Sequence, residues 1–270
     1  MKILNGDYCM DNLLFDSKRI ADGYANDRPW LHKSIMEQIK AEFVDKIPFH
    51  NGLDVGCGAG LSTKALKLIC DHVTGTDLSE EMVQVCKTLY PASDFTFYAA
   101  KAEETKMPQT PYDIVTAAGV VDWVDKDRFL KNMKLVMAKN APLILYDFWI
   151  SDKMLDNPFY TDWFQNKYLI TFPKPPRNET LWEQEDIPKI FTFTKQIICQ
   201  MQYEFDLSSF MRFMMTQTNI NAKIRNGCMT EQVVLDWMQK TLRPIFKEQR
   251  QTLIFDGYIR IYIRGTEEQE

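Results

Sequence analysis

A glycine-rich segment at residues 53–63 constrains the fold of this chain more than any other feature. It reads Leu-Asp-Val-Gly-Cys-Gly-Ala-Gly-Leu-Ser-Thr, so a short apolar run leads into three glycines and then into a run with helical spacing. Glycine adopts positive φ without strain and lets a ligand approach the backbone closely. In an open α/β sheet such a turn lies at the carboxyl ends of the strands, where ligands bind. The segment therefore predicts a small-molecule site at residues 56–60.

Residues 52–150 alternate between strand-like and helix-like segments. Strands are expected at 52–55, 72–76, 94–99, 112–118 and 142–150, and helices at 61–69, after the N-cap residue Ser79, and at 128–138. This alternation predicts a parallel sheet with right-handed crossovers. The second strand ends at Asp77, 21 residues after Gly56. A carboxylate at that place can accept both hydrogen bonds of a ribose diol.

The segment from residue 151 to about residue 190 interrupts the alternation and is rich in proline. Of the 34 aromatic residues in the chain, 16 lie between residues 146 and 213. An inserted cap with its own small core explains this clustering. Because large insertions often form lids or binding loops, some of the rings are also candidates for the walls of an acceptor pocket.

The C-terminal part is expected to complete the sheet. A helix is predicted at about 230–242, followed by β-rich runs at 250–255 and 258–264 on either side of an Asp256-Gly257 pair. An Asp-Gly pair between two such runs is a hairpin signal. We therefore divide the chain into an N-terminal helical cap segment (1–50), a cofactor-binding core (51–150), an inserted cap (151–225), and a C-terminal helix and hairpin (226–270).

Composition narrows the possible partners and compartment. The chain has 32 Lys and Arg against 37 Asp and Glu, a net charge of −5, which disfavours binding to nucleic acid through a broad basic surface. It shows no signal-peptide core and no apolar run long enough to span a membrane, so we expect no membrane contact. The six cysteines form no C-x-x-C pair, which favours free thiols in the cytoplasm and no metal site. All three histidines, His32, His50 and His72, lie early, which argues against a triad with a C-terminal histidine.

Two cofactors compete for the glycine segment. A dinucleotide site requires G-x-G-x-x-G, but residue 61 is leucine here, which disfavours NAD. The segment instead resembles motif I of the class I S-adenosylmethionine-dependent methyltransferases, h-D-h-G-C/T-G-x-G. The resemblance covers residues 20–150 and, more loosely, the C-terminal runs. It implies an α/β fold with a Rossmann-like, mostly parallel seven-stranded sheet, an antiparallel C-terminal hairpin and an inserted aromatic-rich cap. It also implies S-adenosylmethionine as cofactor, released as S-adenosylhomocysteine.

The resemblance assigns roles to individual residues. Residues 75–82 are similar to the second family motif, in which Asp77 would hold the ribose and Leu78 would lie on the adenine. Residues 100–103 take the place of the turn that meets the adenine edge, and residues 112–119 that of the strand facing the methionine part. The cofactor-binding residues implied in this way are Asp54, Gly56, Cys57, Gly58, Gly60, Asp77, Leu78, Met82, Ala102, Glu103, Ala118 and Gly119. Trp123 stands where relatives carry an aromatic ring near the methyl group, so it would line the acceptor pocket.

A segment before the core adds to the resemblance. Residues 24–30, Tyr-Ala-Asn-Asp-Arg-Pro-Trp, are similar to the Y-x-x-x-R-P segment of small-molecule members related to trans-aconitate methyltransferase. The likeness implies that Tyr24 and Arg28 close over the methionine end of the cofactor, with Arg28 near its carboxylate. Residues 210–220 are weakly similar to a helix of the same subgroup, and they also fit an amphipathic core helix packed through its methionines.

The predicted function is in-line transfer of a methyl group from S-adenosylmethionine to a small molecule, with oxygen, nitrogen and carbon acceptors all open. No catalytic residue is identified; Asp122 beside Trp123 is a candidate, although a solvated loop carboxylate is the simpler interpretation. The alternatives are a non-catalytic cofactor-binding module and an NAD-dependent oxidoreductase. A methyltransferase acting on nucleic acid or protein is disfavoured by the acidic charge and by the absence of a D/N-P-P-Y/F tetrapeptide after the fourth strand.

Overall fold

The computed structural model describes residues 18–106, 110–174, 182, 187, 189–247 and 249–266. Its centre is a seven-stranded sheet in the order β3-β2-β1-β4-β5-β7-β6. The strands are β1 (Phe49–Val55), β2 (Cys70–Asp77), β3 (Phe95–Ala99), β4 (Ile114–Ala118), β5 (Pro142–Met154), β6 (Phe191–Phe205) and β7 (Gln251–Arg264). The helices are α1 (Lys18–Asn26), α2 (His32–Glu42), α3 (Leu61–Leu66), α4 (Glu80–Leu89), α5 (Lys126–Val136), α6 (Phe159–Trp163), α7 (Leu169–Thr171), α8 (Leu207–Met215), α9 (Thr218–Arg225) and α10 (Glu231–Phe246).

The sheet is parallel over its first five strands and antiparallel at the end. Strand β1 pairs in parallel with β2 and β4, β2 with β3, and β4 with β5. Strand β7 is antiparallel to both β5 and β6. This confirms the predicted Rossmann-like, mostly parallel sheet with an antiparallel C-terminal pair. Because β1, β2 and β4 all run the same way, their carboxyl ends meet at one edge of the sheet.

Apolar residues alternate between the two faces of the sheet and bury two separate cores. On one face, Ile35 and Ile39 of α2 pack with Ala65 and Leu66 of α3, and this cluster continues into the aromatic residues of the cap. On the other face, Phe129 and the rest of the apolar side of α5 cover β1, β4 and β5. Such two-sided cover is what a buried parallel sheet requires.

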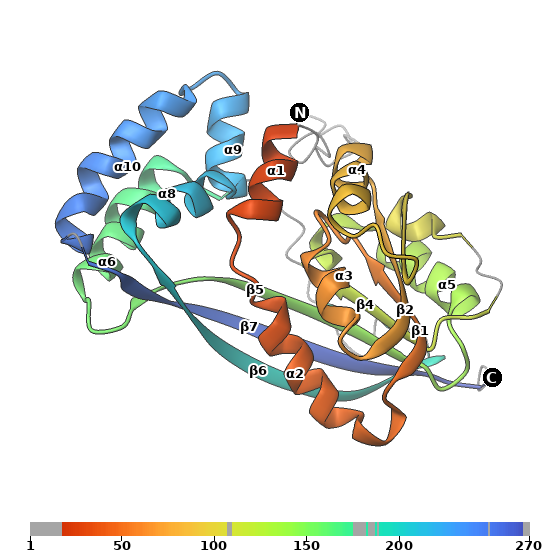
Figure 1. Ribbon diagram of the computed structural model, residues 1–270. Helices are drawn as coiled ribbons and strands as arrows, with labels where there is room; N and C mark the ends of the chain where they lie inside the picture. The colour runs from red at the N-terminus through yellow and green to blue at the C-terminus, as the bar shows by residue number, and fades with distance from the viewer. Residues whose placement is uncertain are drawn as a thin grey trace, which may run out of the picture.

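The three long strands connect the core to a helical cap. Strands β5, β6 and β7 have 13, 15 and 14 residues, whereas β3 and β4 have five. In Figure 1 they extend well beyond the parallel half of the sheet and lead to helices α6, α8 and α10. Stacked and edge-to-face rings such as Tyr160, Trp163 and Phe210 hold this cap together. None of the helices within the described ranges is both long and apolar enough to cross a membrane.

The predicted turn at Asp256-Gly257 is wrong, because both residues lie in the middle of β7. Besides β5, the antiparallel neighbour of β7 is β6, which comes from residues expected in the inserted cap. Gly257 serves close strand packing: a Cβ there would lie 2.6 Å from the Asp147 carbonyl oxygen and 2.9 Å from Phe148 Cβ. In a sequence, a glycine that allows two strands to approach closely looks the same as a glycine in a turn.

Several helix boundaries follow local signals. Ser79 caps α4 by accepting a hydrogen bond from the Met82 amide, as predicted. Helix α10 begins after the N-cap Thr230 and continues to Phe246, four residues past the expected end. The helix suggested for residues 210–220 is two helices, α8 and α9, because the chain turns at Gln217 before α9 begins. Residues 1–17 and much of 175–188, which belong to the predicted N-terminal and inserted caps, lie outside the described residues.

Candidate cofactor and acceptor site

The glycine turn forms the connection between β1 and α3. Gly56, Gly58 and Gly60 have φ values of +68°, +52° and +89°. Gly60 is the N-cap residue of α3, and the Cys57 amide donates to the Thr76 carbonyl oxygen of β2. The left-handed conformation at three alternate positions bends the backbone sharply, and a non-glycine residue would be strained at each of them. The backbone conformation therefore explains why residues 56, 58 and 60 are all glycine.

Space around the three glycines differs, and the difference shows where a ligand fits. A Cβ on Gly56 would lie 2.4 Å from Val120 Cγ2, and one on Gly60 would lie 2.6 Å from Tyr90 Cε2. A Cβ on Gly58 would meet nothing closer than Tyr24 Cδ1, at 3.8 Å. Gly56 and Gly60 are thus packed against protein, whereas Gly58 faces open space. This cradle fits a ligand that lies against the backbone, as an adenosyl amino acid would.

Asp54 stabilises the turn from behind and does not line the cavity. Its fully buried carboxylate accepts hydrogen bonds from the hydroxyls of Ser62 at 2.6 Å, Thr63 at 2.7 Å and Thr116 at 3.0 Å. It therefore joins β1 to the first turn of α3 and to β4. Burial raises the pKa of this carboxyl to about 6, although the three hydroxyl donors lower it in part. The resemblance assigned Asp54 to cofactor binding, and the structure places it one layer below the site.

The raised pKa of Asp54 predicts a specific pH dependence of stability. The folded state binds this proton more tightly than the unfolded chain, so the stabilisation is complete below about pH 4 and is lost as the pH rises from 3.8 to about 6. The loss amounts to at most about 3 kcal/mol. In Asp54→Asn, the free energy of unfolding measured by urea denaturation at pH 4, 5, 6 and 7 should lack this decrease. Identical pH slopes for the wild type and the variant would contradict the assignment.

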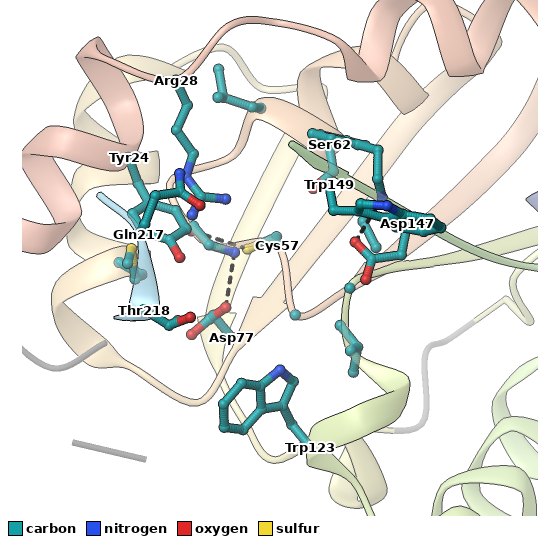
Figure 2. A pocket seen from close by; sticks show the side chains of 18 of the residues that line it. Tyr24, Arg28, Cys57, Ser62, Asp77, Trp123, Asp147, Trp149, Gln217 and Thr218 are labelled. Carbon is teal, nitrogen blue, oxygen red and sulfur yellow. Dashed lines mark hydrogen bonds between the residues drawn. The ribbon is translucent and has the colours of Figure 1, made fainter. Parts of the chain in front are cut away.

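Asp77 lies at the carboxyl end of β2, against the glycine turn. One of its carboxylate oxygens accepts from the Gly58 amide at 2.8 Å, and the other accepts from the Ser79 amide at 2.9 Å. Figure 2 shows the carboxylate below Cys57, and Thr218 and Trp123 line the same cavity. Burial raises the pKa of Asp77, and the backbone hydrogen bonds lower it only in part. The sequence thus placed an acid beside the glycine turn, and the structure brings the two into direct contact.

A cavity of about 1290 Å³ opens over the turn. Of the fifteen residues that the resemblance assigned to the site, thirteen line it: Tyr24, Arg28, Gly56, Cys57, Gly58, Asp77, Leu78, Met82, Ala102, Glu103, Ala118, Gly119 and Trp123. Two predicted cofactor residues, Asp54 and Gly60, are not in its lining, and neither is Asp122. The structure therefore collects segments from five places in the chain around one space, and it moves Asp122 out of the candidate set for direct contact.

The Tyr24–Arg28 segment connects the cavity to the cap. The Arg28 guanidinium lies 3.6 Å over the ring of Tyr24 and donates from Nε to the Thr216 hydroxyl at 3.2 Å and from Nη2 to the Thr216 carbonyl at 3.3 Å. Thr216 ends helix α8. The weak similarity at residues 210–220 therefore marks a segment that holds Arg28 in place, and Gln217, Thr218 and Asn219 next to it line the cavity.

The sequence did not predict most of the cavity lining that comes from β5 and the cap. This wall contains His32 of α2, the residues Asp147–Asp152 of β5, and Phe164, Gln165, Tyr168 and Leu169 after α6. Strand β5 was expected to end at residue 150 but continues to Met154, so Ser151 and Asp152, which were expected in the inserted cap, belong to the strand and line the cavity. The clustering of aromatic residues in the sequence did indicate part of this wall, because the cavity lining includes the rings of Phe148, Trp149, Phe164 and Tyr168.

Comparison with known proteins identifies the core. A family model described as "Methyltransferase domain" matches residues 53–145, which include the glycine turn, Asp77 and strands β2 to β4. Residues 53–145 form a methyltransferase domain. The match agrees with the predicted class I, S-adenosylmethionine-dependent type, and S-adenosylmethionine is the cofactor of such a domain.

Similar proteins agree with this family. A malonyl-[acyl-carrier protein] O-methyltransferase from Bacillus anthracis is 22% identical over 67% of this chain and 64% of its own length. The O-methyltransferase cnsE from Penicillium expansum is 31% identical over 39% of this chain and 41% of its own length. A solved structure from Anaeromyxobacter dehalogenans, described as a type II methyltransferase, has a TM-score of 0.65 at 18% identity and covers 85% of this chain and 94% of its own. The chain therefore spans between about two fifths and two thirds of these curated relatives, and the solved structure shares the methyltransferase fold.

Proposed function

We propose that this protein transfers the methyl group of S-adenosylmethionine to a small-molecule acceptor bound in the same cavity. The observation that carries the proposal is the continuity of the space: one cavity runs from the glycine turn and Asp77 to the wall formed by β5 and the cap. A non-catalytic binding module would be favoured by a cap that seals the cofactor away from any further pocket. The additional wall of aromatic and polar side chains supports an acceptor site instead.

The cofactor would be held by residues from both sides of the sheet edge. The Gly58 backbone offers the open cradle, and Asp77 offers a carboxylate for the ribose hydroxyls. Leu78, Met82, Ala102 and Glu103 would surround the adenine, and the Glu103 carboxylate is already fixed by the Asp125 amide at 2.9 Å. Tyr24 and Arg28 would close over the methionine end, with Ala118 and Gly119 beneath it. Asp54 and Gly60 would act through the shape of the turn.

Methyl transfer mainly requires that the acceptor atom, the methyl carbon and the sulfur lie in line. S-adenosylmethionine supplies a methyl group on a sulfonium, which is already a good leaving group, so donor activation by a side chain is unnecessary. The walls of the cavity exclude water and orient the acceptor; orientation alone contributes about 7–11 kcal/mol in favourable systems. The Trp123 ring lines the cavity, where an aromatic face stabilises positive charge. An acceptor with a carboxylate needs no general base, whereas a phenol or an amine requires a proton acceptor.

Charge and thiol state support a small-molecule acceptor and a cytoplasmic setting. The net charge of −5 favours small molecules over nucleic acid. Among the described cysteines, Cys57, Cys70, Cys86, Cys199 and Cys228 are free thiols, which is typical of a reducing compartment. Cys9 lies outside the described residues.

Transfer of a labelled methyl group tests the proposal. Protein is incubated with S-adenosylmethionine carrying a labelled methyl group and, separately, with the small-molecule, nucleic-acid and protein fractions of a cell extract. We expect label to appear in a small molecule, and to be lost in Asp77→Ala. Label found only in nucleic acid or protein would overturn the acceptor class. Cofactor binding without transfer to any fraction would favour the non-catalytic module.

A further inference from the structure

His32 occupies a place in the site that neither the glycine turn nor the cap explains. It is the first residue of α2, and it lines the cavity together with Arg28 and Phe148. The ring of His32 packs edge-on against Tyr146 and Phe148, with centroid distances of 5.8 Å and 5.0 Å. Its Nδ1 atom lies 2.9 Å from the Tyr146 hydroxyl oxygen. The imidazole is thus held rigidly in the cavity wall by β5.

The Tyr146 hydroxyl determines which nitrogen of His32 carries the proton. Tyr146 is 1% exposed, and His32 Nδ1 is its hydrogen-bond partner among the described residues. Burial, followed by the charges of Asp54 and Asp147, raises the pKa of Tyr146 well above its usual value, so the phenol keeps its proton. A buried hydroxyl proton without an acceptor is costly. The hydroxyl therefore donates to Nδ1, and a neutral imidazole must then carry its own proton on Nε2.

His32 is neutral in this environment. Burial, and secondarily the positive charge of Arg28, lowers the pKa of its imidazole to about 3. In the part of the chain that the structure describes, Nε2 makes no hydrogen bond. Because Nδ1 accepts the hydrogen bond of Tyr146 and Nε2 is protonated, the side chain offers one N–H donor and no free acceptor. This arrangement is unsuited to a general base and suited to binding an oxygen atom.

Arg28 supplies a second donor at the same place. Its Nε and Nη2 atoms are occupied by Thr216, whereas Nη1 has no hydrogen-bond partner among the described residues. Arg28 and His32 both line the main cavity, and both also line a small side pocket of about 40 Å³ beside Phe148 and Phe213. A charged donor and a neutral donor on one wall match the two oxygens of a carboxylate.

We propose that His32 and Arg28 together bind a carboxylate in the cavity, with His32 as a fixed Nε2–H donor and not as a proton acceptor. The proposal rests on the proposed function, because it concerns a ligand of the same cavity. The carboxylate belongs either to the methionine part of the cofactor or to the acceptor. The position of His32 against β5, next to Phe148, favours the acceptor, and the test below separates the two sources.

The tautomer is tested by nitrogen-15 NMR of histidine side chains. The chain has three histidines, so the loss of one signal set in His32→Phe assigns the residue. We expect the Nε2–H tautomer for His32 in the wild type, and a shift of the population toward Nδ1–H in Tyr146→Phe, which removes the donor to Nδ1. An Nδ1–H tautomer in the wild type would overturn the proposal. Because His32→Phe leaves the Tyr146 hydroxyl unpaired, His32→Phe combined with Tyr146→Phe serves as the folded reference.

Ligand titrations identify the carboxylate. S-adenosylhomocysteine is compared with methylthioadenosine, which lacks the amino-acid carboxylate; phenylacetate is compared with phenylacetamide in the presence of S-adenosylhomocysteine. A shift of His32 Nε2 with S-adenosylhomocysteine but not with methylthioadenosine supports the proposal and assigns the cofactor carboxylate. A shift with phenylacetate but not with phenylacetamide supports it and assigns the acceptor. No shift in either comparison, while S-adenosylhomocysteine still binds, overturns this inference alone; absence of S-adenosylhomocysteine binding overturns the proposed function.

Variants of His32 measure how much its hydrogen bond contributes to the affinity for the carboxylate ligand. His32→Phe combined with Tyr146→Phe should weaken binding of the carboxylate ligand identified above by about tenfold, the value of one hydrogen bond to a charged group. His32→Gln, which retains an N–H donor, should recover part of this affinity. His50→Gln, a change on the exposed surface near Asp71, should leave the affinity unchanged. Equal affinity in the wild type and in the double variant would contradict the role of His32.

Discussion

Asp77→Ala is expected to lower the affinity for S-adenosylhomocysteine by about 100-fold or more. The carboxylate accepts the Gly58 and Ser79 amides, so it is already oriented toward the turn before a ligand binds. Hydrogen bonds to a charged group contribute about 1.5–3 kcal/mol each, and the ribose offers two hydroxyls. Two such bonds correspond to a factor of at least about 100 in the dissociation constant. Isothermal titration calorimetry of the wild type and the variant measures the difference.

Two further variants separate the binding effect from a folding defect. Asp77→Asn keeps the shape of the side chain and one acceptor oxygen, so its affinity should lie between those of the wild type and Asp77→Ala. Asp71→Asn removes an exposed carboxylate at the opposite end of β2 and should bind S-adenosylhomocysteine as the wild type does. If Asp77→Ala folds, by circular dichroism, and binds within about threefold of the wild type, Asp77 does not hold the ribose.

Gly56→Ala should both destabilise the protein and abolish cofactor binding. The residue has a φ of +68°, and a Cβ there would lie 2.4 Å from Val120 Cγ2. Backbone strain of about 1–2 kcal/mol and the displacement of Val120 add to a loss of about 2–4 kcal/mol in the free energy of unfolding. Because Val120 directly follows Gly119 and both residues line the cavity, the same displacement deforms the floor of the site. Thermal denaturation with and without S-adenosylhomocysteine measures both effects.

Gly227 provides the matched control. Its φ of +69° is nearly the same, but nothing lies within 4 Å of the position that a Cβ would take. Gly227→Ala should therefore show only the backbone strain, about 1 kcal/mol, and an unchanged stabilisation by S-adenosylhomocysteine. If Gly56→Ala resembled Gly227→Ala in stability and in ligand response, the tight packing of the turn against Val120 would not matter for the site.

The parts of the site that the sequence predicted are those set by short-range geometry. The glycines at 56, 58 and 60 require positive φ, and Asp77 ends a strand that pairs with β1, so spacing along the chain determines their meeting. The same holds for the Ser79 cap of α4. Local rules of this kind act within one strand, turn and helix, and one sequence suffices to apply them.

The remaining parts depend on contacts between distant segments. Arg28 meets Thr216 across 188 residues, and His32 meets Tyr146 across 114. No spacing rule connects such pairs, because the long strands β5, β6 and β7 and the cap decide which segments face each other. At Gly257 a local rule gave a wrong prediction. The local pattern indicated a turn, but the packing of β7 on β5 required a residue without a side chain. Asp54 likewise belongs to the motif, while its burial beneath the turn became visible only in three dimensions.

The most direct test of the central claim is a calorimetric titration of the wild-type protein with S-adenosylhomocysteine. The structure predicts saturable binding of one equivalent per chain, since the Gly56–Gly60 turn and Asp77 line one cavity. A titration that shows no saturable heat, with NAD binding in its place, would contradict the assignment of this turn to an adenosyl amino acid.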